Sequence, residues 1–382
     1  MKGKLGFVIT LIVLYLVSSG ISYGIFRTVA RDVLPTTPDT INPGEGFQVD
    51  QSAPKTEACP LNGKLYSKQE KAVWEKRRPL AVMLENHTEA RPHSGISKAD
   101  IVYEAVAEGG ITRFMAVFYC GIAEPTEFAP VRSARTYYVD WVSEYDALYN
   151  HVGGAGVCSD VTVDTRAKAL CQIGQYGIKD LDQFGISFPT CFRNPDRIGR
   201  TVATEHQMVC GSEGLYKIAA QRGWTDVDED GVSWTKGFTP WKFKEDAKEK
   251  GTTAKIDMGW WAGYKDYNAT WDYDAATNEY KRSTGGQPHM DNESNTQLTA
   301  KTVVVQFSKE TGPVDTHKHM LYETVGSGDA LIFMDGNVID GSWSKKSRIA
   351  RTIFMDGKGK EVTFNPGVIW IEIIPDGNTV TY

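Results

Sequence analysis

The sequence lacks a basic excess and closely spaced cysteine pairs. Its 42 Lys and Arg residues are outnumbered by 48 Asp and Glu residues, which gives a formal net charge of −6. Sequence-independent binding of nucleic acid needs a broad basic face, so no nucleic-acid partner is expected. None of the six cysteines belongs to a C-x-x-C pair. This spacing argues against a zinc ribbon and against thioredoxin-type redox chemistry.

Long hydrophobic runs are also scarce, and the one that stands out lies at the N-terminus. Gly6 to Phe26 contains no charged residue, and a helix of roughly 20 apolar residues matches the hydrocarbon core of a bilayer. The alternative is a cleaved signal peptide, because Lys2 and Lys4 supply a basic n-region. The run is longer than the usual signal core of about 7–15 residues. We therefore expect a single-pass transmembrane anchor at residues 6–26, with a cytoplasmic tip at residues 1–5.

The cysteines decide the orientation that the flanking charges leave open. Lys2 and Lys4 on one side are balanced by Arg27 and Arg31 on the other. All six cysteines follow the hydrophobic run: Cys59, Cys120, Cys158, Cys171, Cys191 and Cys210. An even number favours disulfides and hence an oxidising compartment, and Cys158 is most readily paired with nearby Cys171. We expect the bulk of the chain to be extracytoplasmic, at the cell membrane.

The chain after the anchor divides into three parts. Residues 27–77 are rich in proline and predict a stalk with a short helix. Residues 78–228 mix strand-like runs, such as Leu80–Leu84 and Ile101–Val106, with helical spacing at Tyr137–Tyr149. Residues 229–382 contain short β runs separated by Asp-Gly turns. The predicted fold is an α/β or α+β N-terminal exported domain followed by a mostly antiparallel β C-terminal domain.

Polar residues gather in the glycine-punctuated loops of the first domain. Arginine beside flexible glycine backbone suits bidentate recognition of phosphate or carboxylate. The predicted ligand-binding residues are Arg113, Arg132, Arg135, His151, Glu104, Glu108, Arg193 and His206. His151 and His206 are also the candidate catalytic residues, because imidazole titrates near neutral pH. The alternative is structural, with Arg132 and Arg135 paired to Glu104, Glu108 or Asp140.

An acidic run at the end of the first domain has half of a calcium motif. Asp226, Asp228 and Asp230 alternate before Gly231, as in the first half of an EF-hand loop. The acid expected at the twelfth position is replaced by Gly237. An acidic interdomain turn is therefore favoured over a calcium site, and no cofactor is expected.

Two long motifs resemble the YerB-like bacterial envelope lipoproteins, a domain of unknown function. They are RPLAVMLENHTEARPHSGISKADIVYEAVAEGGITRFMAVF and APVRSARTYYVDWVSEYDALYNHVGG, and VGSGDALIFMDGNVIDGSWSK and FNPGVIWIEIIP extend the match toward the C-terminus. The resemblance implies two consecutive domains and an envelope location, with no established reaction. This chain departs from the family in lacking a lipobox cysteine. It also has Glu205-His206-Gln207 where the family has Pro-His-Asn.

The order of strand, arginine loop, Asn-His-x-Gly-Gly and arginine series is also similar to LytR-CpsA-Psr envelope proteins, which handle lipid-linked glycan pyrophosphates. We therefore expect an envelope protein that binds an anionic ligand bearing phosphate or carboxylate. One alternative is a non-catalytic scaffold or adaptor that binds an envelope protein or glycan. A second is a phosphotransferase acting on lipid-linked envelope precursors. The sequence leaves open whether the protein is an enzyme.

Overall fold

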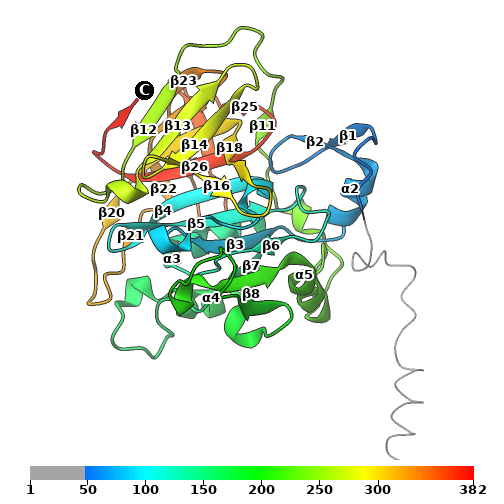
Figure 1. The fold of residues 1–382 in the computed structure, drawn as a ribbon, viewed down its shortest axis with the longest axis vertical. Coiled ribbons are helices and arrows are strands. Elements are labelled where there is room, and N and C mark those ends of the chain that lie inside the picture. The colour runs from blue at the N-terminus through cyan, green and yellow to red at the C-terminus, as the bar shows by residue number, and fades with distance from the viewer. Residues whose placement is uncertain (1–47) are drawn as a thin grey trace, which may run out of the picture. The chain divides into compact units, whose positions relative to one another are not determined.

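A ten-stranded sheet at the centre of the protein takes strands from both halves of the chain (Figure 1). The computed structural model describes residues 48–382, so the expected cytoplasmic tip, the anchor and residues 27–47 of the expected stalk lie outside the described residues. Within residues 48–382, no helix has the length and apolar character needed to cross a bilayer.

The first half of the chain supplies five neighbouring strands of this sheet. They are β4 (Ile101–Glu108), β5 (Ile111–Phe118), β3 (Leu80–Glu85), β7 (Leu148–His151) and β8 (Lys179–Asp182), in spatial order. The second half supplies β24 (Ile353–Asp356), β23 (Asn337–Lys345), β22 (Gly326–Met334), β19 (Thr302–Ser308) and β26 (Ile369–Pro375). The halves meet where β26 runs parallel to β4, with Ile369 opposite Ile101 and Glu372 opposite Glu104. The two regions expected as separate domains therefore share one sheet.

A second, smaller sheet packs on the central strands. It is wholly antiparallel and contains β15 (Gln287–Pro288), β14 (Glu279–Thr284), β13 (Ala269–Asp274), β12 (Lys255–Met258) and β27 (Val380–Thr381), with β18 (Thr299–Ala300) beside β14. Trp271 of this sheet meets Trp370 of β26 edge to face, with ring centroids 5.2 Å apart.

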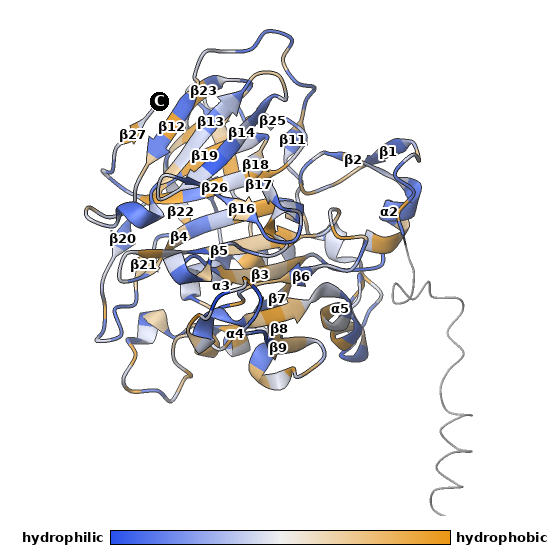
Figure 2. Cartoon of the chain, in the orientation of Figure 1, coloured by the Kyte–Doolittle hydropathy of each residue, from blue (hydrophilic) through white to orange (hydrophobic). Residues whose placement is uncertain are grey.

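Helix α3 (Thr136–Val142) covers the other face, where Trp141 stacks on Tyr103 of β4 at 5.4 Å. Because both faces are covered, the six residues of β3 are all buried, and Figure 2 shows β3 and β7 as hydrophobic bands.

The remaining elements are short and surround these layers. The helices are α2 (Lys68–Trp74), α4 (Ala169–Tyr176) and α5 (Ser212–Gln221). A three-stranded sheet contains β6 (Glu127–Phe128), β10 (Met208–Gly211) and β9 (Cys191–Arg193). Two-stranded pairs are β1 (Lys55–Ala58) with β2 (Leu65–Ser67), β11 (Lys242–Phe243) with β25 (Thr363–Phe364), β16 (Met290–Asp291) with β17 (Thr296–Gln297), and β20 (Glu310–Thr311) with β21 (Leu321–Tyr322).

The predicted order of a mixed region followed by mostly antiparallel strands is confirmed in these elements. One expected helix is corrected. The helical spacing of Tyr137–Tyr149 continues beyond the helix itself, because α3 ends at Val142 and Asp146 turns the chain with a left-handed φ of 45°. Leu148 and Tyr149 then enter the sheet as β7, buried between β3 and β8. At Leu148 and Tyr149, pairing with the neighbouring strands overrides the local helical pattern.

The predicted disulfides are present in the described chain. Cys59 bonds to Cys120, Cys158 to Cys171 as expected, and Cys191 to Cys210, so no described cysteine is free. Each bond closes a loop and thereby restricts the unfolded chain.

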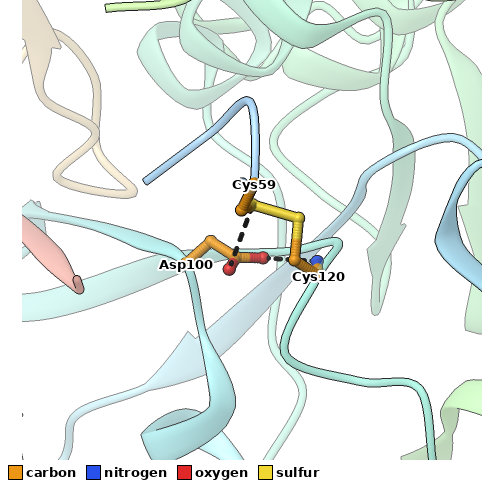
Figure 3. A group of neighbouring side chains, drawn as sticks. All are labelled: Cys59, Asp100 and Cys120. Atoms are coloured by element: carbon orange, nitrogen blue, oxygen red, sulfur yellow. Dashed lines mark hydrogen bonds between the residues drawn. A yellow bond between two sulfur atoms is a disulfide. The ribbon is translucent and has the colours of Figure 1, made fainter. Parts of the chain in front are cut away.

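The Cys59–Cys120 bond lies against a buried carboxylate, Asp100 (Figure 3). Asp100 accepts hydrogen bonds from the amides of Tyr119 at 2.6 Å and Cys120 at 2.9 Å and from the Asn62 side chain at 2.7 Å. Its Oδ1 lies 3.8 Å from Cys59 Sγ, which has no proton to donate in a disulfide. Burial raises the pKa of Asp100 to about 6, although the amide hydrogen bonds oppose that rise.

A carboxyl with a raised pKa in the folded state makes unfolding depend on pH. Folded Asp100 binds a proton more tightly than unfolded Asp100, whose pKa is near 3.8. Protonated Asp100 therefore contributes fully to stability below its unfolded pKa, and this contribution is lost as pH rises through about 6. The loss lowers the free energy of unfolding by up to about 3 kcal/mol. The Asp100→Asn variant should gain stability relative to the wild type across this window. Urea unfolding at several pH values measures the difference, and a constant difference would contradict the assignment.

A fully buried ion pair joins the two sheets. Arg282 on β14 donates to the Glu104 carboxylate on β4, and its Nε lies 3.8 Å from Glu372 on β26. All three side chains are inaccessible to solvent. Burial, followed by the neighbouring Glu104, raises the pKa of Glu372. Glu372 therefore keeps its proton, and one carboxylate balances one guanidinium.

An imidazole ring accepts a second hydrogen bond from Arg282. Arg282 donates to His289 Nδ1 at 2.6 Å, and His289 Nε2 lies 2.8 Å from His93 Nδ1. His93 Nε2 in turn donates to the backbone oxygen of Glu85. Burial lowers the pKa of His93 to about 3 and that of His289 well below its ordinary value. Both rings are therefore neutral links in one hydrogen-bonded chain.

Removal of the Arg282 side chain should therefore destabilise the fold severely. The Arg282→Met substitution leaves Glu104 buried without its cation, so we expect a loss of about 3–5 kcal/mol in the free energy of unfolding by urea. Lys281→Ala is the matched control, because Lys281 is the next residue of β14 but is 44% exposed in its pair with Asp274. Its cost should stay below about 1 kcal/mol. Equal losses in both variants would show that the buried pair is not a major determinant of stability.

Candidate functional site

The predicted site residues from β3–β7 and their loops lie along one edge of the central sheet. β3, β4 and β7 end at this edge and β5 begins there, which places Glu108, Arg113 and His151 near it. The structure nevertheless divides the predicted residues among four contact groups, and Glu104 belongs to the buried pair with Arg282. At 0% exposure Glu104 has no face for a ligand.

The second group is a closed trio of one carboxylate and two guanidiniums. Glu108 accepts from Arg113 at 2.9 Å and from Arg135 at 2.6 Å, while Arg113 also donates to the Ser133 carbonyl. Burial alone would raise the pKa of Glu108, but the charges of Arg113 and Arg135 outweigh it and hold the pKa well below its usual range. These two arginines are thus occupied within the protein, which is the structural alternative foreseen for Arg135.

His151 forms the third group. Its ring is buried, its Nδ1 lies 2.8 Å from the Gly153 carbonyl oxygen, and its Nε2 lies 2.9 Å from Asp180 Oδ1. The Nε2 contact has ion-pair distance but not hydrogen-bond alignment, since Nε2 has no hydrogen-bond partner among the described residues. His151 therefore orients the Gly153–Gly154 turn next to Asp180, away from the arginine trio.

The fourth group surrounds Glu85, the last residue of β3. Its carboxylate pairs with Arg132, whose side chain is 26% exposed. His206 Nδ1 lies 4.0 Å from the same carboxylate, and this buried nitrogen has no hydrogen-bond partner in the described part of the chain. The ring of His206 stacks on His87 with centroids 4.8 Å apart and planes 10° apart. Burial lowers the pKa of His206, with Glu85 opposing, so the ring is neutral at neutral pH.

A loop that carries three arginines borders this group. The Arg193 guanidinium donates to the Thr204 carbonyl, Arg197 donates to the carbonyls of Ala90 and Pro92, and Arg200 donates to those of Glu89 and Arg91. In the described part of the chain, none of these three guanidiniums has a carboxylate partner. The disulfide between Cys191 and Cys210 joins the two ends of the loop.

The acidic run expected as a turn or a calcium loop folds as a turn. Asp228 Oδ1 accepts hydrogen bonds from the amides of Asp230 at 3.0 Å and Val232 at 2.8 Å. This oxygen is therefore used to hold the backbone turn. Asp226, Asp228 and Asp230 do not bring three ligand atoms together. Within residues 48–382, the sets that do so are Cys59 with Asp100 and Cys120, and His87 with Glu89 and His206. The first set is closed by its disulfide.

Sequence reasoning missed Glu85 and Glu89 as site residues. Glu85 directly follows a hydrophobic run. In the structure it ends β3 opposite Arg113, and its carboxylate pairs with Arg132 and lies 4.0 Å from His206 Nδ1. The signal that could have found it is an acidic residue at the end of a fully apolar strand, next to an Asn-His pair.

The fold and the site define a disulfide-linked protein with mixed sheets and few helices, in which two consecutive regions share one sheet. The sequence matches the family model for the N-terminal domain of a protein of unknown function (DUF3048) over residues 63–225, and the model for its C-terminal domain over residues 257–371. The chain belongs to this family.

A relative in Bacillus subtilis (strain 168), named as a candidate lipoprotein, YerB, is 31% identical over 332 residues. That match covers 86% of this chain and 89% of the relative. The crystal structure of YerB from Bacillus subtilis has a TM-score of 0.68 at 25% identity, and covers 86% of this chain and 100% of that chain. The resemblance to YerB-like proteins is thereby confirmed.

The Glu108 trio generates a prediction on acid stability. A carboxyl with a depressed pKa stabilises the fold above its unfolded pKa of about 4.5 and loses that contribution as pH falls below it. The Glu108→Gln variant should be less stable than the wild type by about 1.5–3 kcal/mol at pH 7. This deficit should shrink on acidification below about pH 4. Thermal or urea unfolding at pH 7, 5 and 3 would show it, and a deficit that grows in acid would contradict the ion-pair assignment.

Proposed function

We propose that the protein is an extracytoplasmic envelope protein that binds an anionic ligand, bearing phosphate or carboxylate, on the face made by residues 86–93 and 193–207. The arginines of this face differ from those first expected to bind the ligand. Arg113 and Arg135 share the carboxylate of Glu108, and Arg132 is paired with Glu85. Arg193, Arg197 and Arg200 retain their charge.

The observation that carries the proposal is the type of acceptor that these three arginines use. A backbone carbonyl fixes the direction of a guanidinium but, unlike a carboxylate, does not cancel its charge. Arg197 is held in this way through two nitrogens, both at 2.5 Å from carbonyl oxygens. A guanidinium with a fixed orientation loses little side-chain entropy on binding, which favours bidentate recognition of phosphate or carboxylate.

The surroundings modulate this charge. Burial, followed by the neighbouring Arg200, lowers the pKa of Arg197 to about 10, which leaves it protonated at neutral pH. Glu205 is exposed and lies within the electrostatic reach of His206, Arg132 and Arg193. An incoming anion would therefore compete with Glu205 at one end of the face. At the other end, the guanidinium of exposed Arg200 donates to the backbone oxygens of Glu89 and Arg91.

The compartment follows from the cysteines and the family. Three disulfides in one chain are typical of proteins outside the cytoplasm, and the relative YerB is named as a candidate lipoprotein. In this location, the arginine face has access to the phosphate- and carboxylate-bearing polymers and lipids of the envelope.

The test compares the Arg193→Ala/Arg197→Ala/Arg200→Ala triple variant with the wild type. Pyrophosphate and citrate serve as probes in isothermal titration calorimetry at low ionic strength. We expect the triple variant to bind at least about tenfold more weakly, because three charge-assisted contacts are lost.

Arg222→Ala is the matched control, because Arg222 is also exposed and also donates to a carbonyl, that of Asp180. It should leave binding unchanged. Equal affinity in the triple variant and the wild type, or a matching loss in Arg222→Ala, would contradict the proposed face. Circular dichroism confirms that each variant is folded.

A further inference from the structure

Two histidines and two carboxylates meet beside the arginine loop. His87 and Glu89 belong to the first turn after β3, where η1 (Thr88–Ala90) begins, and His206 ends η6 (Thr204–His206). One ligand atom from each of His87, Glu89 and His206 can be chosen so that all three lie within 4.8 Å of one another. The fourth residue, Glu85, lies behind His206.

The distances are too long for hydrogen bonds and close to those across a metal ion. His206 Nε2 lies 4.0 Å from the Glu89 carboxylate. Two ligand atoms about 2.1 Å from one tetrahedral Zn²⁺ ion lie roughly 3.4 Å apart, so a small inward movement suffices. Glu89 can make it, because its side chain is 53% exposed and has no Lys or Arg partner in the described chain.

An independent observation comes from the other ring nitrogen. Among residues 48–382, buried His206 Nδ1 has no hydrogen-bond partner, its side chain is only 6% exposed, and it faces Glu85 Oε2 at 4.0 Å. A metal-ligating histidine typically directs its second N–H at a carboxylate, which fixes the ring and its tautomer. If a metal ion binds His206 Nε2, the ring proton is on Nδ1. Nδ1 can then donate a hydrogen bond to the Glu85 carboxylate, which gives this buried nitrogen a partner.

His87 is the weaker of the two imidazole ligands. Its Nδ1 accepts the Glu89 amide at 3.2 Å, which leaves the proton on Nε2. Coordination through Nε2 requires the other tautomer and therefore the release of that long hydrogen bond. Since the His87 ring already stacks on His206, the two rings need to rotate but not to shift far in order to coordinate one ion.

We propose that His87, Glu89 and His206 bind a divalent transition-metal ion of the Zn²⁺ type, with Glu85 orienting His206. Two imidazoles and one carboxylate are a ligand set that suits Zn²⁺ or Co²⁺ and leaves a coordination position toward solvent. That position would be open to an oxygen of the anionic ligand, a consequence that rests on the proposed function. Metal binding itself does not depend on it.

The experiment uses the full chain in detergent, with disulfides intact and without a polyhistidine tag. Co²⁺ is titrated in a chloride buffer free of phosphate and is followed by its visible absorption, and Zn²⁺ is titrated by calorimetry. We expect one ion per chain. His206→Ala and Glu89→Gln should each weaken binding at least about tenfold and alter the Co²⁺ spectrum. His87→Ala should weaken it less.

His317→Ala is the control, because His317 also lies beside a second histidine, with its ring centroid 5.7 Å from that of His319. It should change nothing. The absence of saturable binding, or binding that survives His206→Ala but is lost in His317→Ala, would overturn the proposal. Should His206→Ala fail to fold, His206→Gln and Glu89→Gln provide the same comparison.

The two proposals fail separately. The triple arginine variant should retain Co²⁺ binding, so intact metal binding with unaltered pyrophosphate affinity would reject only the anion face. Pyrophosphate binding that needs Arg193, Arg197 and Arg200 in a protein that takes up no Co²⁺ would reject only the metal site.

Discussion

The buried guanidinium of Arg282 is the constraint on which the joined architecture depends. A charge without solvent contact is costly unless a counter-ion and hydrogen bonds surround it. Glu104 provides the counter-ion and His289 accepts a hydrogen bond. The Trp370 ring, whose centroid lies 4.9 Å from the guanidinium carbon, adds cation–π attraction. The sheets that carry Arg282 and Glu104 cannot separate without leaving this charge unpaired, so the two halves of the chain are held in one register.

The same constraint reaches the candidate site. From Arg282 the hydrogen bonds pass through His289 and His93 to the backbone oxygen of Glu85. Glu85 is the point where β3 ends and the turn with His87 and Glu89 begins. The backbone of this turn is therefore fixed from inside by neutral imidazoles, while its side chains face the arginine loop. A surface turn placed in this way can hold charged groups at defined positions without a hydrophobic core of its own.

The contrast between what the sequence predicts and what it misses has a physical basis. Strands such as β3 follow from apolar runs, which are local, and the Cys158–Cys171 pair follows from proximity. The pair of Arg282 with Glu104 joins residues 178 positions apart, and no local pattern indicates it. The sequence offers Glu104, Glu108 or Asp140 as partners of Arg132, yet the antiparallel bridge between Leu84 and Val131 places Arg132 beside Glu85 instead. Partner choice depends on register, and register is a property of the whole sheet.

The partner, rather than the residue type, separates the arginines of the carboxylate pairs from the arginines that we propose to bind an anion. Arg113, Arg135 and Arg282 each end at a carboxylate, whereas Arg193, Arg197 and Arg200 end at carbonyl oxygens. Arg193 ends β9, and Arg197 and Arg200 stand on the loop between β9 and β10, whose ends the Cys191–Cys210 bond joins. Mutual repulsion of three cations favours an open loop, and the disulfide opposes that opening at no cost in charge. A covalent tie thus lets the loop keep an unneutralised cationic face, which an ion pair would have removed.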